Sequence, residues 1–154
     1  MRSDRLLVLA AHLKSDRRGH KIFDFGCYSV GVRDPKRNLC GSAGCALGEL
    51  PVVWPDDWYF GPCSVEGGSN YSVRLKPRGL DIYNSMYVNE GACKWFELSE
   101  DELFALFYAD HELKEDSPIE VLTANATAEQ VADRFIAFVK WREEQVAQEN
   151  KNAS

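Results

Sequence analysis

The sequence predicts an α+β fold in which three or four helices pack around a small, mainly antiparallel sheet. An apolar stripe near the N-terminus and two capping boxes in the last third indicate helices. Short alternating or aromatic segments bounded by glycine, proline and polar residues indicate strands. With 154 residues the chain can bury a core without a metal or a disulfide. We therefore expect one compact domain over residues 1–147 and a frayed polar tail over 148–154.

The first expected helix covers residues 3–15, with Ser3 as its N-cap. His12 lies on this helix but outside its apolar face, so we expect it on the surface. Leucine and alanine recur at positions i, i+3, i+4 and i+7, which is the spacing of one helical face. The predicted buried stripe is Leu6, Leu9, Ala10 and Leu13.

A run of small residues at 40–48, Cys-Gly-Ser-Ala-Gly-Cys-Ala-Leu-Gly, carries two of the five cysteines. Ser42 is a natural N-cap, and the apolar spacing after it predicts a short buried helix that ends at Pro51. The unpaired N–H groups at such a helix start attract anions. Basic residues precede the run, and tryptophans that could stack on a base follow it. The candidate ligand-binding residues are Arg33, Arg37, Gly41, Ser42, Ala43, Gly44, Trp54 and Trp58.

The middle of the chain is expected to be mainly extended. Strands are predicted over residues 22–25, 28–32 and 71–75, and a packed, irregular segment over 52–62. The tripeptide Asn89-Glu90-Gly91 predicts a turn.

The last third contains two expected helices. One begins at Ser99 with a capping box closed by Glu102, and the other begins at Thr127 with a box closed by Gln130. The second helix has a predicted apolar stripe of Val131, Phe135, Phe138, Val139 and Val146. Together with the first helix, these elements predict a core of Leu6, Leu9, Leu13, Phe23, Ala46, Leu47, Leu103, Phe107, Val131, Phe135 and Phe138.

The net charge of −6 disfavours direct nucleic-acid binding, which needs a cationic surface. Residues 1–50 are nevertheless basic, with nine Lys and Arg against five Asp and Glu. The charged start of the chain and the absence of a long apolar run predict no secretory signal and no membrane span. We therefore expect a cytoplasmic protein, and the five cysteines are expected to be free thiols.

The cysteines are also the candidates for metal binding and catalysis. Cys40 and Cys45 lack the second Cys or His pair of a structural zinc site, so we expect neither a metal nor another cofactor. Cys40 follows Arg37 at a predicted helix start, which favours a thiolate. A nucleophile also needs a base, and no histidine lies in a recognisable catalytic context.

Several segments together resemble an uncharacterised family of small bacterial and phage proteins. The shared features are Phe-Asp-Phe-Gly at 23–26, the motif at 40–48, Trp-Phe-Glu-Leu-Ser-Glu-Asp-Glu at 95–102 and Thr-Ala-Glu-Gln-Val at 127–131. The family's own motif is Cys-Gly-Ser/Thr-x-x-Cys-Ala-x-Gly. The resemblance implies one compact domain from a bacterium or its phage and implies no catalytic residue. Residues 52–92 depart from the family pattern.

The sequence favours a non-catalytic cytosolic binding protein, an accessory factor of a phage or bacterium, whose partner is a protein or a small phosphorylated ligand. Two alternatives stay open. One is a thiol-dependent enzyme that uses Cys40. The other is an acidic inhibitor of a nucleic-acid-binding protein, since nine Asp and Glu lie between positions 97 and 120.

Overall fold

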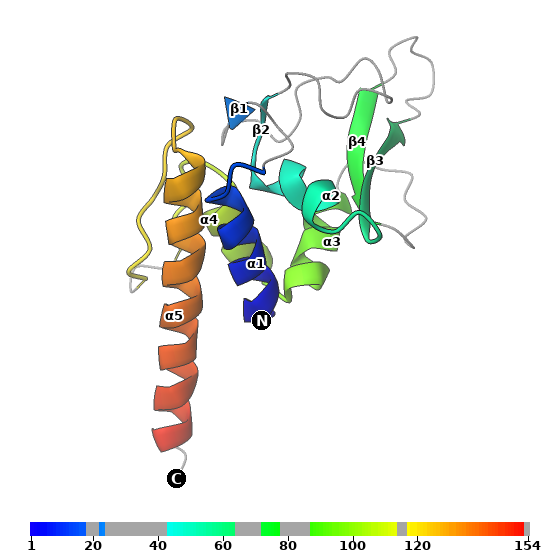
Figure 1. Cartoon of the computed structure of the whole chain (residues 1–154). Helices are drawn as coiled ribbons and strands as arrows, with labels where there is room; N and C mark the ends of the chain where they lie inside the picture. The colour runs from blue at the N-terminus through cyan, green and yellow to red at the C-terminus, as the bar shows by residue number, and fades with distance from the viewer. Residues whose placement is uncertain (18–21, 24–42, 64–71, 78–86, 114–116, 153–154) are drawn as a thin grey trace.

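The computed structural model describes residues 1–17, 22–23, 43–63, 72–77, 87–113 and 117–152. These residues form a mainly helical protein whose longest helix runs along one side (Figure 1). The helices are α1 (Ser3–Leu13), α2 (Leu50–Val53), α3 (Tyr87–Phe96), α4 (Glu100–Phe107) and α5 (Ala128–Asn152), with a 3-10 helix η1 (Ala46–Glu49) before α2. The strands are β1 (Ile22–Phe23), β2 (Ala43–Gly44), β3 (Trp58–Cys63) and β4 (Ser72–Pro77).

The predicted α+β architecture is wrong. In the described residues the helices pack on one another, and no central sheet lies between them. The described strands form only a two-residue parallel contact between β1 and β2 and a two-stranded antiparallel ribbon of β3 and β4. The ribbon lies at one side of the molecule, away from α5 (Figure 1). The apolar helix faces therefore bury one another, and the mostly helical core needs no sheet.

The predicted core is largely confirmed. Every predicted core residue is buried except Phe23, which is half-buried and packs against the core. A chain of aromatic rings links three helices: Phe107 of α4 lies 5.3 Å from Phe96 of α3 and 4.8 Å from Phe135 of α5. The predicted stripe of α5 is also confirmed except at Val146, which is 51% exposed.

Both helix starts that the capping boxes predict in the last third of the chain are confirmed. At α4, Ser99 Oγ accepts from the Glu102 N–H at 3.2 Å, and Glu102 accepts from the Ser99 N–H at 2.8 Å. At α5, Thr127 Oγ1 and the Gln130 side chain make the equivalent reciprocal bonds at 3.2 and 2.8 Å. Both boxes satisfy backbone groups from side chains within one turn, which is why sequence alone can place them.

Three local predictions differ from the structure. The stripe of α1 is confirmed, but the helix starts without a side-chain cap and Ser3 is its first residue. The expected turn at 89–91 lies inside α3, where Gly91 is buried and Tyr108 Oη donates to Asn89 Oδ1 at 2.6 Å. The segment expected to be irregular contains the end of α2, a turn and β3. Beyond these three differences, helix α5 runs to Asn152, and its described residues from position 148, where the polar tail was expected to begin, are exposed.

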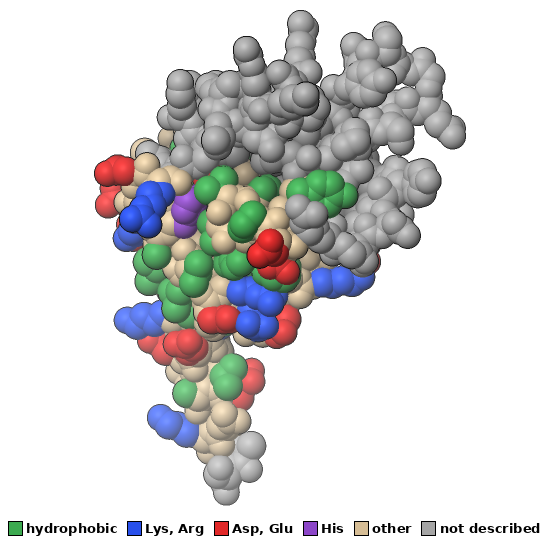
Figure 2. Space-filling view, turned by 45° about the vertical axis from the view of Figure 1, so that its right-hand side comes forward, with side chains coloured by type: hydrophobic (Ala, Val, Ile, Leu, Met, Phe, Trp, Pro, Cys, Tyr) green, Lys and Arg blue, Asp and Glu red, His purple; other side chains and the backbone are tan. Residues whose placement is uncertain are grey.

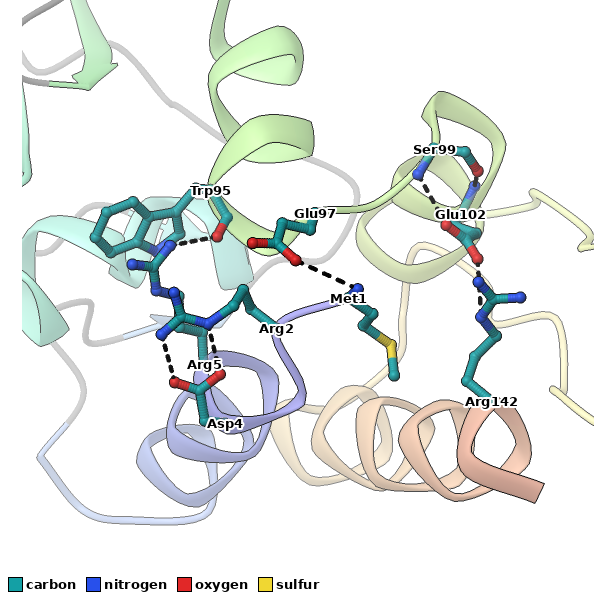
Figure 3. Close-up of polar contacts among 9 residues, drawn as sticks. All are labelled: Met1, Arg2, Asp4, Arg5, Trp95, Glu97, Ser99, Glu102 and Arg142. Carbon is teal, nitrogen blue, oxygen red and sulfur yellow. Dashed lines mark hydrogen bonds and ion pairs between the residues drawn. The ribbon is translucent and has the colours of Figure 1, made fainter. Parts of the chain in front are cut away.

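The N-terminus of α1 is attached to the C-terminal end of α3. The Arg2 N–H donates to Phe96 O at 2.9 Å, and Arg5 Nη1 donates to Trp95 O at 2.5 Å (Figure 3). The Arg5 guanidinium also lies over the Trp95 ring, with Cζ 3.5 Å from the centroid. The last carbonyls of a helix lack intrahelical donors and carry partial negative charge, so these donors stabilise the junction. Beside it, hydrogen bonds from the Arg2 guanidinium lower the pKa of Asp4 to about 2.

Candidate interaction surface

The predicted ligand-binding residues fall into two groups. Arg33, Arg37, Gly41 and Ser42, together with the alternative nucleophile Cys40, lie outside the described residues. Ala43 and Gly44 form β2, in register with Ile22 and Phe23 of β1.

The prediction of a helix that starts at Ser42 is wrong. Ala43 and Gly44 are extended, and the first helical turn after them is η1, which begins at Ala46. Cys45 is its N-cap residue but makes no side-chain capping hydrogen bond. Pro51 lies in the first turn of α2 instead of ending a helix. Proline is compatible with a first turn because the N–H that it lacks has no intrahelical acceptor there.

Trp54 and Trp58 belong to an aromatic cluster that joins α2, β3 and α3. The Trp95 ring lies 5.9 Å from that of Trp54 and 6.2 Å from that of Trp58, both edge to face. Trp58 is 1% exposed, so its ring has no face left for a nucleobase. Trp54 is half-buried and packs against the core. Both residues therefore contribute to packing in this structure.

A histidine–carboxylate pair joins the end of α1 to η1. His12 Nε2 lies 2.8 Å from Glu49 Oε2, and the Glu49 side chain is fully buried. The histidine side chain is 13% exposed, in contrast to the surface position expected for it. The two residues are 37 positions apart, and the 3-10 geometry of η1 directs Glu49 inward, so no local pattern could have paired them.

Exposed apolar side chains lie on the seam between α1 and α5. Lys14, the C-cap residue of α1, and Asp133 of α5 form an ion pair across this seam, with Nζ and Oδ1 2.5 Å apart. Leu7 is two turns before Lys14 and Ile136 is one turn after Asp133, so both lie on the side of the ion pair. Each of these two side chains is 41% exposed. Val8, which is 49% exposed, lies next to Leu7 in sequence but further round α1, on its outer face. Figure 2 shows hydrophobic side chains exposed among charged ones on one face of the molecule.

The sequence contained a signal for this surface that the prediction did not use. Leu7, Val8 and Ile136 are large and apolar but fall outside the predicted buried stripes. Such residues on an outer helix face are candidates for contact with another molecule.

Arg134 of α5 is a buried cation beneath the segment that connects α4 to α5. It is 4% exposed, and its Nη2 donates to the backbone oxygen of His111 at 3.1 Å. Its Nε and Nη1 are buried and have no hydrogen-bond partner in the described part of the chain. Burial lowers the pKa of this guanidinium to about 10, which the nearby charge of Glu120 partly opposes.

Replacing Arg134 with methionine is expected to raise the free energy of unfolding by about 1 kcal/mol. The cation is protonated in both states at neutral pH, and its folded pKa lies below its ordinary value, so its burial opposes folding. Urea unfolding followed by circular dichroism measures the change. Arg17→Met is the control, since Arg17 is exposed and its replacement removes the same charge without a change in burial. A loss of stability in Arg134→Met would show that its bond to His111 outweighs its desolvation.

The cysteines and acidic groups described by the structure give no metal-binding cluster. Cys45 is buried and Cys93 is half-buried, and both are thiols. Burial, followed by the charges of Glu100, Glu102 and Glu90, raises the pKa of the Cys93 thiol. Within the described ranges, no three His, Cys, Asp or Glu side chains lie together as metal ligands would.

The fold and surface define a small, mainly helical protein with a β-ribbon and an apolar seam between two antiparallel helices. Comparison of the chain with family models, curated proteins and solved structures gives no match. The resemblance expected from the motif at 40–48 therefore stays a prediction. In the part of the chain that the structure describes, α5 is long but charged throughout, and no helix meets the requirements for spanning a membrane.

Proposed function

We propose that this protein is a non-catalytic, cytoplasmic protein-binding factor of a phage or bacterium that docks an amphipathic helix of a partner on the α1–α5 seam. The exposure of Leu7 and Ile136 on two adjacent helices, both on the side of the Lys14–Asp133 ion pair, carries the proposal. A partner helix that packs along two neighbouring helices covers their exposed apolar side chains with its own apolar face.

The dimensions and charges of the seam favour a short helix as the occupant. Helix α1 has 11 residues and is about 16 Å long, which matches three turns of a partner helix. The Lys14–Asp133 pair marks one end of the apolar stretch, and the exposed Lys140 lies one turn beyond Ile136. An acidic residue beside the partner's apolar stripe would complement Lys140.

The other functions suggested by the sequence have less support. A phosphorylated ligand at residues 41–44 could not stack on Trp58, because that ring is buried in the core. The acidic residues described between positions 97 and 113 include Glu102, whose carboxylate caps α4 and lies 3.4 Å from Arg142 (Figure 3). This carboxylate thus contributes to the fold.

Substituting Leu7 and Ile136 together with aspartate is expected to weaken partner binding and leave the fold intact. The immobilised protein would be used to retain partners from an extract of the source cells, and the contact segment would be mapped by crosslinking. A synthetic peptide of that segment should bind the native chain at least about tenfold more tightly than the variant, because two apolar contacts are replaced by charge.

The matched control is Gln148→Asp, an exposed aspartate substitution near the far end of the same helix. It should bind the peptide as the native chain does. Equal binding by the double variant, or a mapped contact segment without an apolar helical stripe, would refute the proposal. Circular dichroism and thermal unfolding establish that each variant is folded.

A further inference from the structure

The C-terminal part of α5, residues 142–152, extends past the other helices and is here called the overhang (Figure 1). The 25-residue helix is about 37 Å long, and its buried residues lie before Lys140. Val146 is two turns after Val139, so it continues the core-facing stripe. It is nevertheless 51% exposed, whereas Val139 is buried. The overhang therefore presents to solvent the face that α5 buries elsewhere.

A recess lies where the overhang leaves the body of the protein. It has a volume of about 280 Å³ and is lined by Met1, Ser3, Arg142, Glu143 and Val146. Val146 is thus a half-exposed aliphatic side chain that forms part of the wall of the recess. An isologous interface is formed by the same patch on both copies, so an exposed aliphatic side chain beside a hollow can meet its own copy there.

The charges around the recess are also self-complementary. Arg142 and Glu143 are adjacent in sequence, have opposite charge and line the same recess as Val146. If a two-fold axis passed through the recess, the arginine of each copy would face the part of the other copy that carries the glutamate, because both residues line the recess. The Arg142 Nε–Glu102 distance of 3.4 Å leaves further guanidinium donors for such a contact (Figure 3).

We propose that two copies of this chain associate about a two-fold axis at the overhang. Val146 of each copy enters the recess of the other, and Arg142 lies beside Glu143 of the partner subunit. This interface does not use Leu7, Val8 or Ile136, so it is independent of the proposed partner helix.

Sedimentation equilibrium of the full chain over a range of concentrations tests this proposal. The native chain is expected to show a concentration-dependent doubling of mass. Val146→Asp should raise the dimer dissociation constant at least about tenfold, because it replaces the aliphatic side chain at the contact with a hydrated carboxylate. Ala147→Asp is the matched control: it adds the same charge at the adjacent exposed residue and should leave the constant within about twofold.

A charge exchange tests the orientation of the two copies. Glu143→Lys should weaken the dimer by placing two cations together, and combining it with Arg142→Glu should restore much of the loss. A native chain that stays monomeric at about 0.5 mM, or a dimer unaffected by Val146→Asp, would overturn the proposal. The Leu7→Asp/Ile136→Asp variant should dimerise normally, so a failure of the partner-helix proposal is distinguishable from a failure of this one.

Discussion

Replacing Phe135 with alanine is expected to lower the free energy of unfolding by about 3–5 kcal/mol. The Phe135 side chain is fully buried, and its ring lies 4.8 Å from Phe107, which in turn contacts Phe96. The substitution removes the α5 member of the aromatic chain and leaves a cavity between helices that cannot collapse fully. Since small domains are stable by about 5–15 kcal/mol, this loss is a large part of the total.

Urea unfolding measured at the helical circular dichroism band gives the value for Phe135→Ala. The matched control is Ile136→Ala, because the next residue on the same helix is 41% exposed and the helix propensity gained is similar. The control should change stability by less than about 1 kcal/mol. Equal losses in the two variants would contradict the packing described for α5.

Replacing His12 with alanine is expected to lower the free energy of unfolding by about 1–3 kcal/mol. The imidazole lies 2.8 Å from Glu49 Oε2, and the glutamate side chain is fully buried. Removing the imidazole takes away one of the interactions of the Glu49 carboxylate, which has no access to water. It also breaks the polar link between α1 and η1.

A double-mutant cycle of His12→Ala and Glu49→Gln isolates this interaction from the loss of packing. The coupling free energy is expected to exceed about 0.5 kcal/mol, and a value near zero would show that the pair does not stabilise the fold. His111→Ala serves as the control for removing an imidazole, because the His111 side chain is exposed. Its effect on stability should be the smaller of the two.

Sequence-based prediction succeeded where the information is contained within a few turns of chain. The stripe of α1 depends on helical spacing alone, and both capping boxes pair groups three residues apart. These patterns were enough to identify most of the core, because apolar faces of helices are buried whatever they pack against. Val146 departs from the pattern because α5 extends beyond the elements that would cover it.

Prediction failed where long-range contacts decide the outcome. Residues 89–91, whose sequence predicted a turn, lie inside α3. There Asn89 accepts a hydrogen bond from Tyr108 and Gly91 is buried, and these tertiary contacts outweigh the low helix propensity of the segment. The helix start expected at Ser42 is replaced by a short strand contact and a 3-10 turn, because Ala43 and Gly44 pair with residues of β1. In the described residues, the β1–β2 contact and the peripheral β3–β4 ribbon are the only strand pairings, and neither forms the central sheet that was expected.

The sequence by itself determined which helical faces are apolar, where α4 and α5 begin, and which residues form most of the core. Local hydrogen bonds and the 3.6-residue period are sufficient for these features. Only the tertiary structure decided that helices pack on helices, that Glu49 is buried against His12, and that Leu7, Ile136 and Val146 remain exposed. These features depend on which faces meet and how far each helix extends, and residues distant in sequence set both.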